Sequence, residues 1–127
     1  MKEVMAVIKM NMMNKTKQAL TDAGIISFTA KDAVGRGRGI VDNNVLKGAD
    51  LGYEEAIAQL GTKRRLVPKR ILWIAVPDKL VRRTVETIIN TNRVGNSSGE
   101  GKIFVLPLIN AIRVRTGEEG DRALDEF

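Results

Sequence analysis

The clearest signal for the fold is Arg70-Ile71-Leu72-Trp73-Ile74-Ala75-Val76, in which every position after the first is apolar. Such a run predicts a strand with apolar side chains on both faces. The sequence then predicts a helix from Asp78 to about Asn92, with Asp78 as its N-cap. A strand predicted from Lys102 to Leu106 completes a βαβ unit. The apolar positions at helical spacing are Val81, Val85, Ile88 and Ile89.

The N-terminal third repeats this order of elements. Met5 to Ile8 predicts a short strand with both faces buried. Lys15 to Ala23 predicts a helix, with Asn14 as the N-cap and Gly24 at the C-terminal end. Ile25 to Val34 then alternates between apolar and polar residues, as a strand does. Two βαβ halves in tandem predict an α+β, ferredoxin-like βαββαβ fold with a four-stranded antiparallel sheet.

The segment between the halves, residues 36–68, has no strong periodicity and predicts one long loop, with Tyr53 to Leu60 as a candidate short helix. Loops of this length in small domains are usually functional or mobile. A last strand segment is predicted from Ala111 to Arg115, before a flexible acidic tail at about 118–127. The whole chain, 1–127, is predicted to be a single domain.

The apolar strand also predicts an oligomer. Two helices cover only one face of a four-stranded sheet, yet Ile71, Trp73 and Ala75 are as apolar as the residues between them. We therefore expect another copy, or a close relative of the same subunit, to cover the open face. The alternative is that this strand is richer in apolar residues than its packing requires.

The composition excludes several classes of chemistry. The chain has 127 residues, a formal charge of +6 and neither Cys nor His. Without these residues a disulfide framework, the usual zinc and copper ligands, and Ser-His or Cys-His catalysis cannot be built. Only Asp and Glu oxygens remain for a hard cation such as Mg²⁺, and no side chain is predicted as a metal ligand. No signal peptide or membrane span is predicted, which favours a cytoplasmic protein.

Three segments combine glycine with positive charge: residues 35–39, 95–102 and 113–117. Glycine lets backbone N–H groups approach an anion, and Lys and Arg supply charge for phosphate oxygens. Arg113 and Arg115 are two apart on a predicted strand, so their side chains are expected on one face. Together the segments predict a nucleotide phosphate site, although residues 35–39 alone are typical of a solvated hairpin or an RNA-contacting tract, and residues 113–115 alone are typical of charge at a strand edge.

The second of these segments is not a P-loop. Its spacing from Gly95 to Gly101 is one residue too long, and Ile103 replaces the Ser or Thr that would hold Mg²⁺. The segment also leads into a predicted strand instead of a helix.

These motifs, in this order, resemble the PII (GlnB-like) signalling proteins over nearly the whole chain. The C-terminal pair of motifs, 99–105 and 112–118, is the most specific part of the resemblance. Within the family, the long loop and residues 111–115 look most like the second PII-like protein of nitrogenase operons in archaea and anaerobic bacteria. The other matching residues are Val7-Ile8-Lys9, Thr29, Gly35-Arg36-Gly37-Arg38 and Pro68-Lys69.

The resemblance implies a trimeric regulator that binds ATP or ADP in clefts between subunits. It is not expected to be an enzyme. Arg113 and Arg115 would reach the phosphates from the neighbouring subunit. The other nucleotide-binding residues that the resemblance implies are Val7, Thr29, Gly37, Arg38, Gly99, Glu100, Gly101 and Lys102.

The resemblance also implies 2-oxoglutarate and Mg²⁺ near the base of the long T-loop, at Lys9, Gly39 and Lys69. The family commonly has Gly-Arg-Gln-Lys-Gly there, whereas this chain has Gly37-Arg38-Gly39-Ile40 and lacks both the Gln and the Lys. Nucleotide binding without 2-oxoglutarate therefore stays an alternative. Tyr53 is displaced from the tyrosine that some bacterial relatives have uridylylated, and its modification is not expected.

The partner implied by the resemblance is dinitrogenase, inhibited through the T-loop, together with the paralogous PII-like protein in homotrimers or mixed trimers. Lys63, Arg64, Arg65 and Arg70 are candidate contacts to an acidic protein surface. The alternatives are a general PII protein acting on an ammonium transporter and a ferredoxin-like RNA-binding module. Neither nucleic acid nor membrane insertion is expected in the leading hypothesis.

Overall fold

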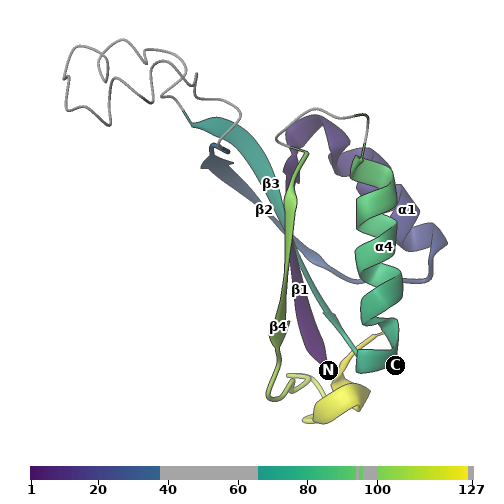
Figure 1. Cartoon of the computed structure of the whole chain (residues 1–127). Helices are drawn as coiled ribbons and strands as arrows, with labels where there is room; N and C mark the ends of the chain where they lie inside the picture. Colours follow the sequence, from purple (N-terminus) through teal and green to yellow (C-terminus); the bar gives the residue numbers. More distant parts are fainter. Residues whose placement is uncertain (38–65, 94, 96–99, 126–127) are drawn as a thin grey trace.

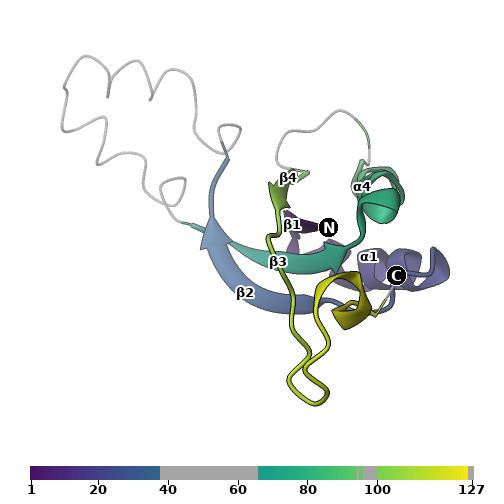
Figure 2. The ribbon, with the colours of Figure 1, turned by 90° about the horizontal axis from the view of Figure 1, so that it is seen from below.

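The computed structural model describes residues 1–37, 66–93, 95 and 100–125. In this part of the chain, four strands form one sheet, and two α-helices lie side by side on one of its faces (Figures 1 and 2). The same residues contain three short 3₁₀ turns. The elements in chain order are β1 (Lys2–Lys9), η1 (Met10–Met12), α1 (Met13–Asp22), β2 (Thr29–Gly35), β3 (Val67–Val76), η4 (Asp78–Leu80), α4 (Val81–Asn92), β4 (Lys102–Pro107) and η5 (Gly120–Ala123).

The strand order β2-β3-β1-β4 confirms the predicted ferredoxin-like βαββαβ fold. All three strand pairs are antiparallel. The register is set in the centre of the sheet, where Met5 of β1 lies opposite both Trp73 of β3 and Phe104 of β4. Within the described residues no helix has both the length and the hydropathy needed to span a membrane.

The core lies between the sheet and the two helices. It takes every second residue of the two central strands, because successive strand side chains point to opposite faces. The helices contribute Leu20 of α1 and Ile88 of α4, and Ile25 completes the cluster from the chain after α1. The fully buried strand residues are Val4, Ala6, Ile8, Leu72, Ile74 and Val76.

The other face of the sheet stays open in a single chain. Met5 and Trp73 there are half-buried, and Phe104 is 43% exposed. The prediction that both faces of β1 are buried is therefore met only on the side of the helices. The apolar open face is the surface for which the sequence predicts a covering subunit.

The end of α1 explains why β2 begins later than predicted. Gly24 has φ +86°, the left-handed conformation that glycine adopts without strain. Its N–H donates to the Thr21 carbonyl at 3.0 Å, and the Ile25 N–H donates to the Leu20 carbonyl at 2.9 Å. This is a Schellman motif, closed by the buried side chains of Leu20 and Ile25. Ile25 therefore belongs to the helix end, and β2 starts only at Thr29.

Neither predicted N-cap is correct. Asn14 lies inside α1, which begins at Met13 because η1 leads directly from β1 into the helix. Asp78 begins η4, and α4 itself starts at Val81. The Asp78 carboxylate pairs instead with the N-terminal ammonium at 3.0 Å and with Lys2 Nζ at 3.6 Å. Strand pairing brings the start of β1 close to Asp78, because Lys2 lies opposite Val76 at the end of β3.

This ion pair makes a pH-dependent contribution to stability. The hydrogen bond from the N-terminal ammonium, with the charge of Lys2, lowers the pKa of Asp78 below its ordinary value of 3.8. A carboxyl whose pKa is lower in the folded state adds stability above its unfolded pKa and loses it as the pH falls through the folded value. Between about pH 5 and pH 2, we expect the melting temperature of Asp78→Asn to fall less than that of the wild type.

The matched control for this experiment is Glu86→Gln, since Glu86 is exposed on α4 and makes no ion pair with the described residues. Its melting curve should follow the wild type at every pH. An Asp78→Asn curve that also follows the wild type would contradict the role of this ion pair.

The predicted last strand, Ala111 to Arg115, is wrong. Ile112 makes only an isolated bridge, to Glu119, and residues 114–116 form a turn. The Gly117 N–H donates to the Arg113 carbonyl at 2.7 Å, and Gly117 has φ +75°. The chain therefore reverses on itself before a regular strand can form. Residues 118–125, predicted as a flexible tail, complete this hairpin and continue into η5.

Candidate functional site

The open face carries the predicted anion-binding residues of the central and edge strands. Val7 lies opposite Ile71 on one side and Lys102 on the other. One row further along the same face, Lys9 lies opposite Lys69. Residues directly opposite in antiparallel strands share a face, so these positions form one surface at one end of the sheet. Register alone brings them together from three distant segments.

The charges of this surface favour a bound anion. Lys9 and Lys69 are half-buried, and like charges directly opposite each other destabilise a sheet. Lys102 adds a third ammonium group in the next row, and it is exposed. A phosphate or carboxylate near these residues would offset their mutual repulsion. The residues therefore fit an anionic ligand.

Gly101 joins this surface through a close contact between backbones. Its φ is +128°, and a Cβ built on it would lie 2.6 Å from the Val7 carbonyl oxygen. No real Cβ packs so closely, so the start of β4 can approach β1 in this way only with glycine. The predicted site residues Val7 and Gly101 are thus in direct contact.

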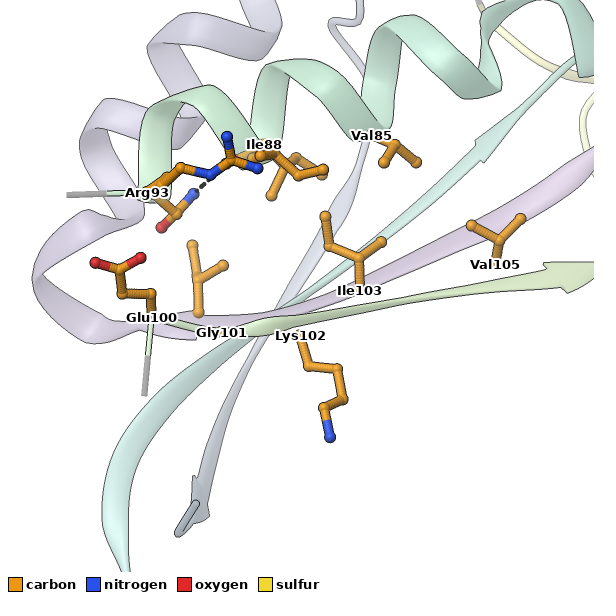
Figure 3. A pocket seen from close by; sticks show the side chains of 11 residues that line it. Val85, Ile88, Arg93, Glu100, Gly101, Lys102, Ile103 and Val105 are labelled. Atoms are coloured by element: carbon orange, nitrogen blue, oxygen red, sulfur yellow. Dashed lines mark hydrogen bonds between the residues drawn. The ribbon is translucent and has the colours of Figure 1, made fainter. Parts of the chain in front are cut away.

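Figure 3 shows that the side chains around the start of β4 point to opposite faces of the strand. Ile103 and Val105 point toward α4, whereas the Lys102 side chain lies on the opposite side of the strand. Glu100 and Arg93 lie near one end of a cavity of about 370 Å³ between α4 and β4. Glu100 is therefore placed by this cavity and not on the surface that carries Lys102.

The cavity contains a polar group that sequence reasoning missed. Asn92 is 7% exposed, and its Nδ2 donates to Thr16 Oγ1 at 3.0 Å and to the Ile88 carbonyl at 2.9 Å. Because that carbonyl only accepts, the amide orientation is determined. The buried Oδ1 has no hydrogen-bond partner among the described residues. From the sequence, Asn92 is predicted only as the approximate last residue of a helix.

Thr29 and Gly37 lie at the two ends of β2: Thr29 is its first residue, and Gly37 follows its last. Gly37 follows the end of β2, where Gly35 pairs with Val67, so it lies at the same end as Lys69. Thr29 lies opposite Trp73, on the other edge strand from Lys102. Three strand spacings separate these edges, about 14 Å. Thr29 and Lys102 therefore do not meet within one chain.

Arg113 and Arg115 lie at the opposite end of the molecule from Lys102. β4 runs the length of the sheet from Lys102, opposite Val7, to Pro107, opposite Lys2. The C-terminal hairpin that carries both arginines follows beyond that far end (Figure 1). Within one chain, the structure does not bring these arginines to the lysines of the open face.

The described residues cover only part of the predicted site. Arg38, Gly39, Gly99, Tyr53 and residues 63–65 lie outside them. No group of three or more acidic residues in the described ranges is placed to hold a metal ion.

Arg70, a predicted contact to an acidic protein surface, already has a partner in its own sheet. Its guanidinium forms an ion pair with Asp32, directly opposite on β2. A contact from Arg70 to an acidic surface would have to compete with Asp32.

Residues 1–118 match the family model described as nitrogen regulatory protein P-II. A protein of Methanobacterium ivanovii, named nitrogen fixation nifHD region GlnB-like protein 2, is 40% identical over 98% of this chain and 99% of its own length. A protein with the same name from Methanothermobacter marburgensis is 39% identical over 98% of this chain and all of its own. Nitrogen regulatory protein P-II 1 of Escherichia coli is 35% identical with the same coverage.

Proposed function

Because the chain belongs to the nitrogen regulatory protein P-II family, we propose that it binds ATP or ADP and controls nitrogenase through contact with dinitrogenase. The observation that carries the nucleotide site is the position of Lys102, opposite Val7 on the open face and directly after Gly101, which contacts the Val7 backbone. These groups can hold phosphate oxygens with ammonium charge and backbone N–H groups. The site binds and signals, and the protein acts as a regulator of an enzyme rather than as an enzyme.

The complete site requires a neighbouring subunit in this proposal. Arg113 and Arg115 follow the end of β4 that is far from Lys102. Thr29 lies on the edge strand at the other side of the sheet. The apolar open face, with Phe104 43% exposed, would be covered in the same assembly. A trimer, formed from this chain alone or mixed with its paralogue, accounts for both features.

2-Oxoglutarate and Mg²⁺ are proposed as further ligands at the same end of the sheet. Lys69, opposite Lys9, supplies the cationic pair for a dicarboxylate. Mg²⁺ would be held mainly by oxygens of the bound ligands, since no group of acidic side chains in the described residues is placed to hold it, and it would offset the negative charge of those ligands. The chain lacks the Gln and Lys that the family commonly has after Arg38, so ATP binding alone is the simpler form of the proposal.

The nitrogenase target is supported by the names of the relatives. Both methanogen proteins above are named for a nitrogen fixation region, and each matches 98% of this chain. The loop between β2 and β3 is the proposed contact with dinitrogenase. A cytoplasmic location follows from that partner.

Calorimetry tests the nucleotide site. We expect ATP and ADP to bind the purified protein, alone or mixed with its paralogue. No heat of binding in either sample would contradict the proposed function.

A pull-down tests the partner. From nitrogen-limited and ammonium-fed cells, we expect the tagged protein to retain dinitrogenase in a way that changes with nitrogen supply. Retention of an ammonium transporter in its place would favour the general PII alternative.

A further inference from the structure

The C-terminal segment holds the Arg113 side chain within its own chain. Arg113 Nη2 lies 3.3 Å from Asp125 Oδ1, and Nε lies 3.7 Å from Glu118 Oε1. Nη2 also lies 3.3 Å from the Ala123 carbonyl and 3.5 Å from that of Arg122. Carboxylate and carbonyl oxygens thus already surround the guanidinium that the proposed function assigns to phosphate.

The side chain of Arg115, two residues away, is not held in this way. It lies in the exposed turn of the hairpin and forms no ion pair with any described residue. The two arginines of the same motif are therefore not equivalent: Arg115 is available to an incoming anion, whereas Nη2 and Nε of Arg113 already lie beside carboxylate and carbonyl oxygens.

The occupying residues are held in place by the fold. Leu124 is 5% exposed and anchors the segment next to Phe28 and Trp73. A hydrogen bond from Ser27, followed by the guanidinium of Arg113, lowers the pKa of Asp125, so this carboxylate is charged at neutral pH. On the other side, Asn110 Oδ1 accepts from the Gly120 N–H at 3.1 Å and closes the hairpin.

We propose that Asp125 and Glu118 compete with the ligand phosphate for Arg113, so that the C-terminal segment holds the arginine in a self-inhibited state until nucleotide binds. This inference rests on the proposed function. It deepens that function by assigning a regulatory contact to Glu118, the last residue of the motif at 112–118, and to Asp125, which follows the motif.

The competition is reversible because these contacts are weak. The side chain of Arg113 is 30% exposed, and those of Glu118 and Asp125 are each 44% exposed. Exposed ion pairs contribute little to stability because solvent screens them. A triphosphate brings several charges and pairs with a guanidinium in a bidentate manner, so it can displace single carboxylates.

Asp125→Asn tests the proposal, because it removes the competing charge and keeps the shape of the side chain. We expect the Kd for Mg-ATP, measured by calorimetry on the assembled protein, to fall about two- to fivefold. Glu118→Gln should act in the same direction. The matched control is Asp121→Asn, which makes the same charge change in η5 at a residue outside every ion pair of Arg113.

Two further measurements separate competition from a general charge effect. In an Arg113→Ala background, Asp125→Asn should leave the Kd unchanged, because its only target has been removed. In the wild type, ATP should speed hydrogen exchange at the Leu124 amide, which donates to the Asp121 carbonyl at 3.0 Å within the docked segment.

The outcomes distinguish failure of the proposed nucleotide binding from failure of the proposed competition for Arg113. A wild type that binds no nucleotide contradicts the proposed function itself. A wild type that binds ATP while Asp125→Asn binds equally or more weakly overturns the competition and makes Arg113 a structural clamp. A gain in affinity that Asp121→Asn reproduces would likewise overturn it, as an effect of net charge.

Discussion

Replacing Lys102 with alanine is expected to weaken ATP binding by about 10- to 100-fold, the value of one hydrogen bond to a charged group. Lys102 is exposed on the open face, in the row that contains Val7, and next to the lysine pair of β1 and β3. Its removal leaves the phosphates without their edge-strand cation. Calorimetric titration of the variant with Mg-ATP measures the loss.

The control is Lys17→Ala, which removes the same charge from the exposed side of α1. It should leave the affinity for ATP within about twofold, since long-range charge effects are screened at physiological salt. Equal affinities for wild type and Lys102→Ala, in a variant that melts like the wild type, would remove Lys102 from the site.

Replacing Gly101 with alanine is expected to destabilise the fold by about 2–4 kcal/mol, through strain at positive φ and overpacking together. The added Cβ would lie 2.6 Å from the Val7 carbonyl oxygen, and that oxygen belongs to the backbone of a central strand. The chain therefore has to move β4 away from β1. Urea unfolding of the variant measures the loss, and its ATP affinity should fall with it.

Two glycines separate the contributions of strain and contact. Gly117 has φ +75° but nothing within 4 Å of a built Cβ, so Gly117→Ala should lose only the strain, about 1 kcal/mol. Gly35 has an ordinary φ and the same free space, so Gly35→Ala should change stability by less than about 0.5 kcal/mol. A Gly101→Ala loss no larger than that of Gly117→Ala would contradict the close contact.

The core could be predicted from sequence because its signals are local. The unbroken apolar run from Ile71 to Val76 and the helical spacing of Val81, Val85 and Ile88 are patterns that involve only residues close together in the chain. Gly24 was also predicted correctly, since the Schellman motif closes within one helix turn.

The errors lie where a contact from outside the local pattern determines how a residue is used. Asp78 has the residue type of an N-cap, but the start of β1 brings the N-terminal ammonium and Lys2 to its carboxylate. Arg113 and Arg115 alternate like strand residues, but Glu118 and Glu119 return in a hairpin and take the place of a neighbouring strand. In both cases tertiary contacts override a propensity worth about 1 kcal/mol.

The four strands of the sheet, the helices α1 and α4, the fold class and the family follow from the sequence alone, because periodicity and motif order are properties of consecutive residues. Only the tertiary structure decided which residues meet: Lys9 with Lys69, Val7 with Gly101, and Arg113 with Asp125. Strand register and hairpin closure join segments far apart in the chain, and a slip of one residue would send every side chain to the other face. That register places three ammonium groups on the open face of the sheet and leaves Arg113 among carboxylates at the other end of the molecule.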